Sequence, residues 1–203
     1  WLWAVGHLLP CVDWSSPAMS IFVSIASYCD PVLGFTLGRA LATARRPDRL
    51  HFGVVDQSPA AAPQPAATQL QPARLSYVRV EPVYARGPCW ARALAMSLYE
   101  GEDWFFQIDS HMDFDDGWDE RLIAQAGALL AGRAGVVLSS YPNSFVFDHG
   151  RAVRRPATDK VLAHVVKPGG TFDPQHPVLG FEAHPAPVDH PLPGFHVGAG
   201  CLF

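Results

Sequence analysis

Features that mark several classes of protein are scarce or missing in this sequence. Its four cysteines are spread widely and form no CxxC pair, so their spacing predicts neither a zinc knuckle nor a disulfide scaffold, and we expect free thiols in a reducing compartment. Lys and Arg number 15 against 19 Asp and Glu, and this net charge of −4 argues against a nucleic-acid binder. The apolar run at the N-terminus is too short to span a membrane, and no basic residue precedes it as in a signal peptide.

The two ends of the chain lack the usual marks of a complete domain. The first residue is Trp1 rather than Met, and we expect residues 1–19 to be an uninformative leader or the end of an upstream fragment. Residues 198–203 have the pattern of the middle of a strand. We therefore expect one domain over residues 20–203 that is truncated at its C-terminal end.

What the sequence does contain is apolar and rich in turns. Hydrophobic residues make up 49% of the chain, enough to bury a substantial core. Apolar runs typical of buried strands alternate with helical patterns. The predicted strands are 21–26, 51–55, 75–80, 104–108 and 136–140. The first predicted helix runs from Asp30-Pro31 to about residue 45, the second from Gly87-Pro88 to about residue 99, and the third from Trp118 to about residue 131. This order predicts an α/β fold with a mostly parallel central sheet, in which the most apolar strand, 104–108, is central.

Two segments depart from this alternation. Residues 58–74 are rich in Ala and Pro, and we expect them to form a mobile surface loop that builds no core of its own. After Tyr141-Pro142 the pattern weakens, and strands near 161–167, 178–183 and 196–203 would form a less regular, antiparallel region.

The strongest candidate for a functional site is Asp109-Ser110-His111. Asp109 follows the predicted strand 104–108, and open α/β sheets bind ligands at the carboxyl ends of their strands. Residues i and i+2 of an extended chain point to the same side, so the carboxylate and the imidazole can reach one ion. Such a pair suits Mn²⁺ better than Mg²⁺, and the metal would neutralise a diphosphate leaving group. A lone Asp-x-His also arises by chance.

The charged residues on either side of this triplet allow two interpretations each. Arg86 and Arg92 flank the start of the second helix, where free amides and guanidinium groups suit phosphate, but Arg92 could equally be an exposed helical residue. Asp113, Asp115 and Asp116 follow the triplet. We interpret them as helix capping and solvated charge, the alternative being a second source of metal ligands.

Several segments, in order, resemble one family of glycosyltransferases. They are residues 21–31 (IFVSIASYCDP), 86–92 (RGPCWAR) and 101–112 (GEDWFFQIDSHM), followed by Trp118-Asp119. They look like the GlcNAc-transferase family (glycosyltransferase family 60), whose type member adds GlcNAc to a hydroxyproline of the cytoplasmic protein Skp1. The resemblance covers residues 20–142 clearly and 195–203 weakly. The Asp-Ser-His triplet also resembles, more distantly, the polypeptide GalNAc-transferases.

The resemblance implies a GT-A fold and a retaining, metal-dependent hexosyltransferase that uses UDP-GlcNAc and a hydroxyl acceptor on a protein or glycan, in the cytoplasm. By this likeness Asp109 and His111 would bind Mn²⁺ or another divalent cation, together with the diphosphate. Other residues implied to contact the donor are Ala26, Ser27, Tyr28 and Asp30 around the uridine, Arg86 and Arg92 near the phosphates, and Ser110. We expect Gln107 and Trp118 to support the site by packing.

The chain departs from the family in three ways. Cys29 stands where many members carry Arg, and residues 58–74 are longer and richer in Ala and Pro than expected. The family's later acidic motif and the histidine that completes the metal shell would lie beyond Phe203, with the catalytic residues. Six other histidines stand mostly beside proline in irregular segments, and we interpret them as surface residues: His149, His164, His176, His184, His190 and His196.

Two alternatives to a transferase remain. The first is a non-catalytic nucleotide-sugar-binding fragment that lacks the C-terminal catalytic and metal residues. The second is a metal-dependent hydrolase that uses the Asp-His pair, for which the sequence offers no further ligand cluster of suitable spacing.

Overall fold

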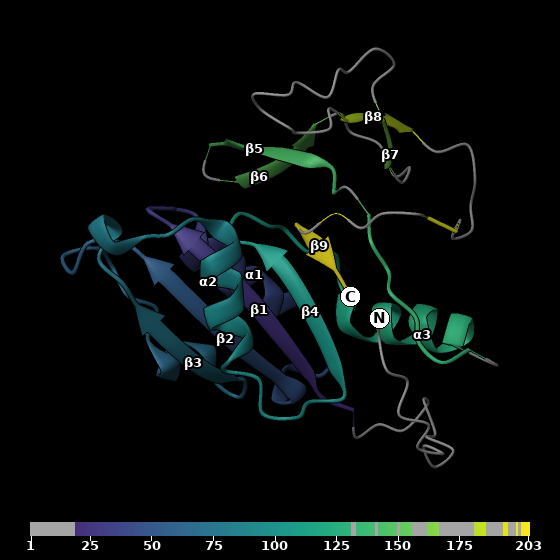
Figure 1. Ribbon diagram of the computed structural model, residues 1–203, viewed down its shortest axis with the longest axis horizontal. Coiled ribbons are helices and arrows are strands. Elements are labelled where there is room, and N and C mark those ends of the chain that lie inside the picture. The colour runs from purple at the N-terminus through teal and green to yellow at the C-terminus, as the bar shows by residue number, and fades with distance from the viewer. Residues whose placement is uncertain are drawn as a thin grey trace.

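A five-stranded sheet organises the fold (Figure 1). The computed structural model describes residues 19–130, 133–140, 142–149, 151–155, 162–166, 181–185, 193–194, 198 and 200–203. The strands lie in the order β3-β2-β1-β4-β9. Four of them run parallel, namely β1 (Ile21–Tyr28), β2 (Leu50–Gln57), β3 (Arg74–Arg79) and β4 (Trp104–Asp109), and the short β9 (Cys201–Leu202) is antiparallel to β4.

The predicted α/β class with a mostly parallel sheet is confirmed, but the predicted central position of the strand 104–108 is not. The central strand is β1, with β2 and β4 as its neighbours, whereas β4 lies between β1 and β9. Both β1 and β4 are covered on both faces, so their apolar character marks an interior strand without saying which one is central.

Helices cover both faces of the sheet. The helices α1 (Leu33–Thr43) and α3 (Trp118–Leu130) pack on the face to which Ile21, Val23 and Ile25 of β1 contribute. The opposite face is covered by α2 (Pro88–Met96), whose Ala91 and Ala95 are fully buried. Because side chains of a strand alternate between faces, Ala26 and Asp109 both fall on the α2 side, where their strands lie in register.

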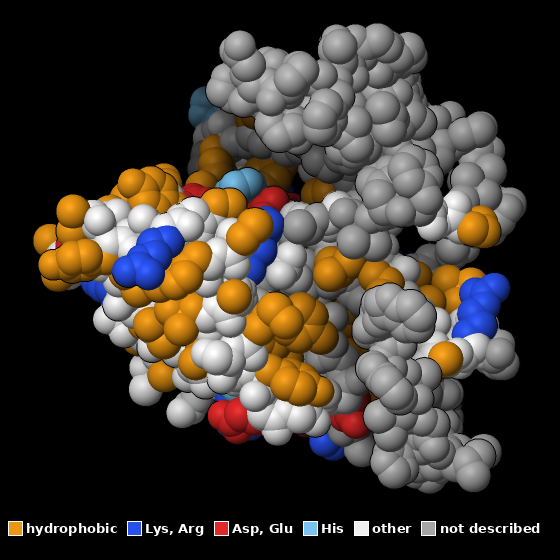
Figure 2. Space-filling model, in the orientation of Figure 1, with side chains coloured by type: hydrophobic (Ala, Val, Ile, Leu, Met, Phe, Trp, Pro, Cys, Tyr) orange, Lys and Arg blue, Asp and Glu red, His pale blue; other side chains and the backbone are white. Residues whose placement is uncertain are grey.

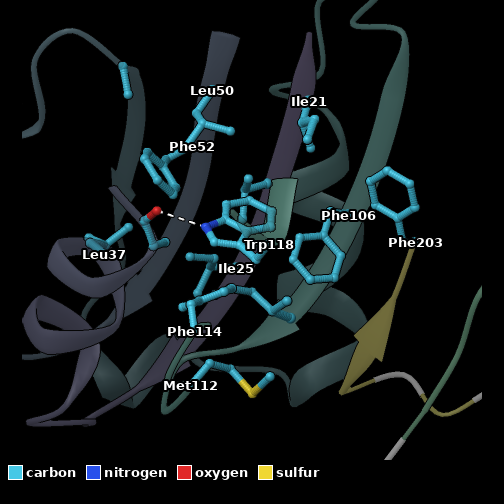
Figure 3. Packing of buried hydrophobic residues seen from close by; sticks show 14 of the residues in the cluster. Ile21, Ile25, Leu37, Leu50, Phe52, Phe106, Met112, Phe114, Trp118 and Phe203 are labelled. Carbon is cyan, nitrogen blue, oxygen red and sulfur yellow. Dashed lines mark hydrogen bonds between the residues drawn. The ribbon is translucent and has the colours of Figure 1, made fainter. Parts of the chain in front are cut away.

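Aromatic rings fill the core beneath α3 (Figure 3). The indole N–H of Trp118 donates to the Ala40 carbonyl at 2.9 Å, and its ring lies 5.4 Å from Phe106 and 5.0 Å from Phe114 between centroids. Phe203 stacks on Trp104 at 5.0 Å. Each such pair contributes about 0.5–1.5 kcal/mol beyond the area it buries. The prediction that Trp118 acts in packing is confirmed.

The start of α1 differs from the prediction. Asp30 was expected to be its N-cap, but the helix begins at Leu33 after Val32, which has no side-chain cap. The Asp30 carboxylate instead accepts the Val32 N–H at 2.8 Å, in a turn before the helix. The prediction is wrong because Pro31 and Val32 form a turn of their own, so the helix begins two residues later than expected. The helix ends at Thr43, as the Arg-Arg-Pro sequence after it indicated, and the 3₁₀ turn η1 (Pro47–Arg49) leads into β2.

The other helices follow the predicted patterns with shifted ends. The helix α2 stops at Met96 rather than Tyr99, and residues 97–99 continue in turns. The helix α3 ends at Leu130, and the predicted end at Ala131 lies outside the described residues. The 3₁₀ turn η3 (Pro82–Tyr84) precedes α2.

The predicted strand 136–140 is wrong. Leu138 exchanges both backbone hydrogen bonds with Phe203, at 2.7 and 2.9 Å, and Ser139 forms a single bridge with Leu202. The segment therefore runs antiparallel to the C-terminal residues without becoming a strand, since its partner β9 is only two residues long.

Two antiparallel hairpins make up the less regular region. The pair β7 (Leu162–Val166) and β8 (Phe181–Pro185) confirms the predicted antiparallel strands there. Residues 161, 167, 178–180, 196, 197 and 199 of the predicted strands lie outside the described residues. The pair β5 (Ser144–Asp148) and β6 (Arg151–Arg155) was not predicted. Phe145 and Phe147 of β5 place their rings 5.6 and 5.0 Å from that of Phe35 on α1.

The Ala/Pro-rich connection between β2 and β3 is mostly exposed, but it is tied to the sheet. It contains the 3₁₀ turn η2 (Ala67–Leu70), and Leu70 and Ala73 are buried in the main core. The Arg79 guanidinium donates to the carbonyls of Ala60, Ala62 and Pro63 at 3.1–3.2 Å. Of the expected leader, residues 1–18 lie outside the described residues and Met19 is buried.

Across the part of the chain that the structure describes, no helix combines the length and the apolar character needed to cross a membrane.

Candidate functional site

A cavity of about 550 Å³ opens where β1, β2 and β4 end and α2 begins. Every residue predicted to contribute to the site lines it, except Arg86; these are Ala26, Ser27, Tyr28, Asp30, Arg92, Asp109, Ser110 and His111. Figure 2 shows a histidine side chain with acidic and basic side chains beside it along one edge of the described face. The cavity thus has the position in which open α/β sheets bind ligands.

Asp109 is the last residue of β4, and its carboxylate projects into the cavity from the α2 face. One oxygen, Oδ1, forms an ion pair with Arg92 Nη2 at 3.0 Å, and both side chains are partly exposed, at 38% and 23%. The Asp109 N–H donates to the Gly200 carbonyl at 3.1 Å. The second oxygen, Oδ2, has no hydrogen-bond partner within the described part of the chain and is available to a ligand.

Gly200 is a residue of this site that the sequence did not single out. A Cβ placed on it would lie 2.5 Å from Asp109 Oδ2 and 3.2 Å from Cγ, closer than real Cβ atoms approach such groups. Glycine therefore leaves the space that the carboxylate occupies. The weak likeness of residues 195–203 to the family was the only signal that could have pointed to it.

His111 and Ser110 are held from the other side by Asp30. The carboxylate oxygen Oδ2 of Asp30 accepts the Ser110 hydroxyl at 2.6 Å and lies 2.8 Å from His111 Nδ1, while Oδ1 accepts the Val32 N–H. Burial of Asp30 opposes its ionisation, but the hydrogen bonds from Ser110, His111 and Val32 outweigh burial and lower its pKa below the ordinary value. Asp30 is thus an ionised acceptor at neutral pH.

The start of α2 faces the cavity across from Asp109. Gly87 precedes the helix with a φ of +85°, a backbone conformation that residues other than glycine rarely adopt. Pro88 is the first residue of the helix, as the sequence predicted. Arg92 lies one turn further on and reaches Asp109, so it is not merely an exposed helical residue. Arg86 is exposed and does not line the cavity, which separates the two arginines that the sequence placed together.

The ends of β1 and β2 form the remaining wall. Tyr28 lies opposite Gln57 in register, and the Gln57 side-chain amide donates to the Ser27 carbonyl at 3.0 Å. Gln57 is buried, lines the cavity and was missed by the sequence argument, because only the pairing of β1 with β2 brings it there. Cys29 follows with φ +47° and an exposed side chain beside Gln57.

A glycosyltransferase family model, described as Glycosyltransferase (GlcNAc), matches residues 20–83 and 64–203, two overlapping segments that together run from 20 to 203. The chain belongs to this GlcNAc glycosyltransferase family. A comparison with curated proteins finds no match.

The aspartates after the triplet are not donors in the cavity of this glycosyltransferase. Asp113 Oδ1 pairs with Arg39 Nε at 2.7 Å and accepts the Phe114 N–H at 2.9 Å, and its side chain is only 15% exposed. The carbonyls of Asp115 and Asp116 accept hydrogen bonds from the start of α3. None of the three lines the cavity. The expected capping is met by the backbone carbonyls of Asp115 and Asp116. Asp113 differs from the expectation, because its carboxylate is paired with Arg39 and is not solvated charge.

The donor atoms of the cavity fit a divalent cation only in part. His111 Nε2 and Asp109 Oδ2 are free of partners among the described residues, and a carboxylate with an imidazole suits Mn²⁺. The described residues hold no group of three or more His, Cys, Asp or Glu side chains arranged for a metal. Phosphate oxygens and water would have to complete the shell, as is usual for nucleotide-bound cations. Among the other histidines, His149 is exposed as expected, and the side chains of the rest lie outside the described residues.

Proposed function

We propose that this chain is a retaining glycosyltransferase that moves GlcNAc from UDP-GlcNAc to a hydroxyl group on a protein, with Mn²⁺ or another divalent cation bound at Asp109 and His111. The observation that carries the proposal is the meeting of Asp109, His111 and Arg92 at one cavity at the carboxyl edge of the sheet, in a chain of the GlcNAc glycosyltransferase family. The likeness to the Skp1 hydroxyproline enzymes supports the protein acceptor.

The cation would be held by Asp109 Oδ2 and His111 Nε2 and would supply positive charge to the diphosphate. Arg92 adds a guanidinium on the same side, and the N-terminal end of α2 borders the same cavity at Gly87 and Pro88. Positive groups placed in this way stabilise the negative charge that develops on the leaving UDP.

Transfer then needs one bond exchange at the sugar. The bond between C1 and the β-phosphate oxygen breaks, and the acceptor oxygen bonds to C1 from the same face, so the configuration is retained. The hydroxyl proton leaves with the phosphate as UDP departs. In this scheme the chain's own residues bind and orient the donor, and Arg92 lies where the leaving group's charge appears.

The nucleoside would lie against the ends of β1 and β2. Ala26, Ser27, Tyr28 and Gln57 line that part of the cavity, and Tyr28 is 59% exposed and offers its ring to a base. Arg86 lies outside the cavity and we assign it no part in donor binding. We place the reaction in the cytoplasm, supported by the free thiols of Cys29, Cys89 and Cys201.

The test is a pair of measurements on the purified chain with Mn²⁺: calorimetric binding of UDP, and release of UDP from UDP-GlcNAc. Binding together with hydrolysis supports the transferase, whereas the absence of both removes it. Binding without any turnover favours the second candidate, a non-catalytic nucleotide-sugar-binding protein. The finding that favours this candidate is the presence of two rather than three metal donors among the described residues.

A matched pair of variants makes the test specific. Asp109→Asn removes a charge at the proposed cation and should abolish Mn²⁺-dependent binding of UDP. Asp113→Asn removes a carboxylate from the loop after β4. Asp113 is paired with Arg39 and does not line the cavity, so this variant should leave UDP binding unchanged.

A further inference from the structure

Asp30 uses both carboxylate oxygens on groups of its own chain. Oδ1 accepts the Val32 N–H at 2.8 Å, and Oδ2 is shared by Ser110 Oγ at 2.6 Å and His111 Nδ1 at 2.8 Å. The side chain is 13% exposed. Both oxygens therefore already have partners within the protein, and neither is left without one for the uridine that the resemblance places beside Asp30. Its contacts therefore argue against the nucleotide-binding role expected from the sequence.

The backbone around His111 is fixed by a second residue. Thr36 on α1 donates its hydroxyl to the Ser110 carbonyl at 2.7 Å and accepts the Met112 N–H at 2.9 Å. These two bonds hold the peptide groups on either side of His111, and Thr36 is fully buried. The main chain is thus set by α1 and the imidazole by Asp30, although 81 residues separate Asp30 from His111.

A carboxylate only accepts hydrogen bonds, so its neighbour His111 Nδ1 must carry the proton. In the neutral ring the lone pair then lies on Nε2, the nitrogen left without a partner in the described part of the chain. A histidine that binds a metal commonly donates its other N–H to a carboxylate in this manner.

We propose that Asp30 is a positioning residue that sets the tautomer and direction of His111, so that Nε2 is presented to the cation. This inference rests on the proposed function. Ser110 acts indirectly in the same way. It is buried, and its hydroxyl donates to the Asp30 oxygen that also accepts the hydrogen bond from His111. Asp30 and Ser110 thereby belong to the support of the metal ligand, not to the nucleotide contacts.

Asp30→Asn inverts this arrangement with almost no change in size. The Val32 N–H still needs an acceptor, so the amide oxygen keeps that place and the amide NH₂ takes the position facing Ser110 and His111. An NH₂ group donates, so Nδ1 becomes the acceptor and the ring proton moves to Nε2. The lone pair needed for the cation is then lost from the nitrogen that faces the cavity.

The experiment is ¹⁵N NMR of the imidazole nitrogens in the full metal-free chain, at a pH at which the ring is neutral. The His111 signals are identified by their loss in His111→Gln. We expect the Nδ1–H tautomer in the wild type and the Nε2–H tautomer in Asp30→Asn. A wild-type ring protonated on Nε2 overturns the proposal, and this spectrum decides it even where the variant fails to fold.

Metal binding provides the second readout. We expect the Mn²⁺ affinity to fall about 10- to 100-fold in Asp30→Asn, as for other residues that orient a metal ligand. Asp113→Asn is the control, since Asp113 is buried to a similar degree but contacts Arg39 instead of His111, and it should keep both the tautomer and the affinity. An Asp30→Asn chain with the wild-type tautomer contradicts the proposal.

The positioning role of Asp30 and the proposed transferase function can be contradicted by different results. UDP affinity that falls in Asp30→Asn equally with Mn²⁺ and with EDTA makes Asp30 a nucleotide contact, which overturns this inference and leaves the proposed function standing. A wild-type chain that binds neither Mn²⁺ nor UDP ends the proposed function, and with it the positioning role toward a metal, whatever the tautomer.

Discussion

Arg86 and Arg92 are six positions apart at the start of α2, yet they have different surroundings. Arg92 lines the cavity and pairs with Asp109 at 3.0 Å, while Arg86 is exposed and does not line it. Spacing along the sequence could not separate them, since both flank a helix N-terminus. Between them lie Gly87, whose φ is +85°, and the first turn of α2, so the two guanidinium groups come from different parts of the backbone.

Arg92→Gln should lower the affinity for UDP about 10- to 100-fold, the usual effect of losing a hydrogen bond to a charged group. Arg86→Gln is the matched control and should change the affinity by less than about threefold, as for an exposed side chain. Calorimetry with Mn²⁺ present measures both. Equal losses in the two variants would speak against the assignment of Arg92.

Gly200→Ala is expected to displace the Asp109 carboxylate, because the new Cβ would lie 2.5 Å from Oδ2. We expect Mn²⁺-dependent UDP affinity to fall about 10- to 100-fold, the range seen when the support of a metal ligand is lost. In Gly198→Ala the nearest atom to the new Cβ is Ser139 Oγ at 3.5 Å, an ordinary contact, and binding should be unchanged. Full affinity in Gly200→Ala would mean that Oδ2 does not bind the ligand.

The residues of the site that the sequence identified are those adjacent to strand ends, and those it missed depend on distant partners. Asp109 and His111 could be predicted because a polar pair follows an apolar strand. Gln57 lines the cavity through the pairing of β1 with β2, and Gly200 reaches the Asp109 carboxylate through the packing of residues near the C-terminus against β4. The contact between Asp30 and His111 could not be predicted for the same reason, since the two residues are 81 positions apart.

At the scale of elements, the strands and helices around the sheet were predictable because each carries its own apolar period. The segment 136–140 has an apolar run but forms only one bridge, since the number of available partners, not its own composition, decides whether it becomes a strand. The hairpin of β5 and β6 was missed. Its aromatic residues pack on Phe35, a contact that local patterns do not encode.

The pairing of β1 with β2 depends on a glycine. A Cβ on Gly53 would overlap the ring of Phe22, which is fully buried and packed against His51, Tyr99 and Phe105. Gly53→Ala should therefore lower the free energy of unfolding by about 1–3 kcal/mol, as overpacked cores do.

Gly34→Ala on the exposed face of α1 is the contrasting substitution. Nothing lies within 4 Å of its new Cβ, so the helix should gain about 0.5–1 kcal/mol. Urea denaturation monitored by circular dichroism gives both values. If Gly53→Ala raised the free energy of unfolding as Gly34→Ala does, the close packing of Phe22 against Gly53 would be contradicted.

At the scale of the whole molecule, a buried hydrogen bond between a carboxylate and a histidine lies at the amino ends of the strands. Glu102 Oε1 is 2.5 Å from His51 Nδ1, and His51 Nε2 is 2.8 Å from the Ser76 hydroxyl. Burial of Glu102 opposes its ionisation, but hydrogen bonds from the Glu100 amide and from His51 prevail, and its pKa is lowered below the ordinary value.

Because the folded pKa of Glu102 is lowered, this carboxylate stabilises the fold at every pH above its unfolded pKa of about 4.3. The stabilisation is lost as the pH falls through the folded pKa. The difference in unfolding free energy between wild type and Glu102→Gln should therefore be largest near neutrality and decline in acid. Glu100→Gln, which breaks a pair with Arg74 that is more than half exposed, should show little such dependence. If wild type and Glu102→Gln differed in unfolding free energy by the same amount at neutral and acid pH, the lowered pKa of Glu102 would be contradicted.

The proposed function depends most on a cation that joins Asp109 and His111 to a diphosphate. The direct measurement is a calorimetric titration of UDP into the purified chain, once with saturating Mn²⁺ and once with EDTA. We predict binding with Mn²⁺ and a loss of about 10-fold or more in affinity with EDTA. Equal affinity under the two conditions would contradict it.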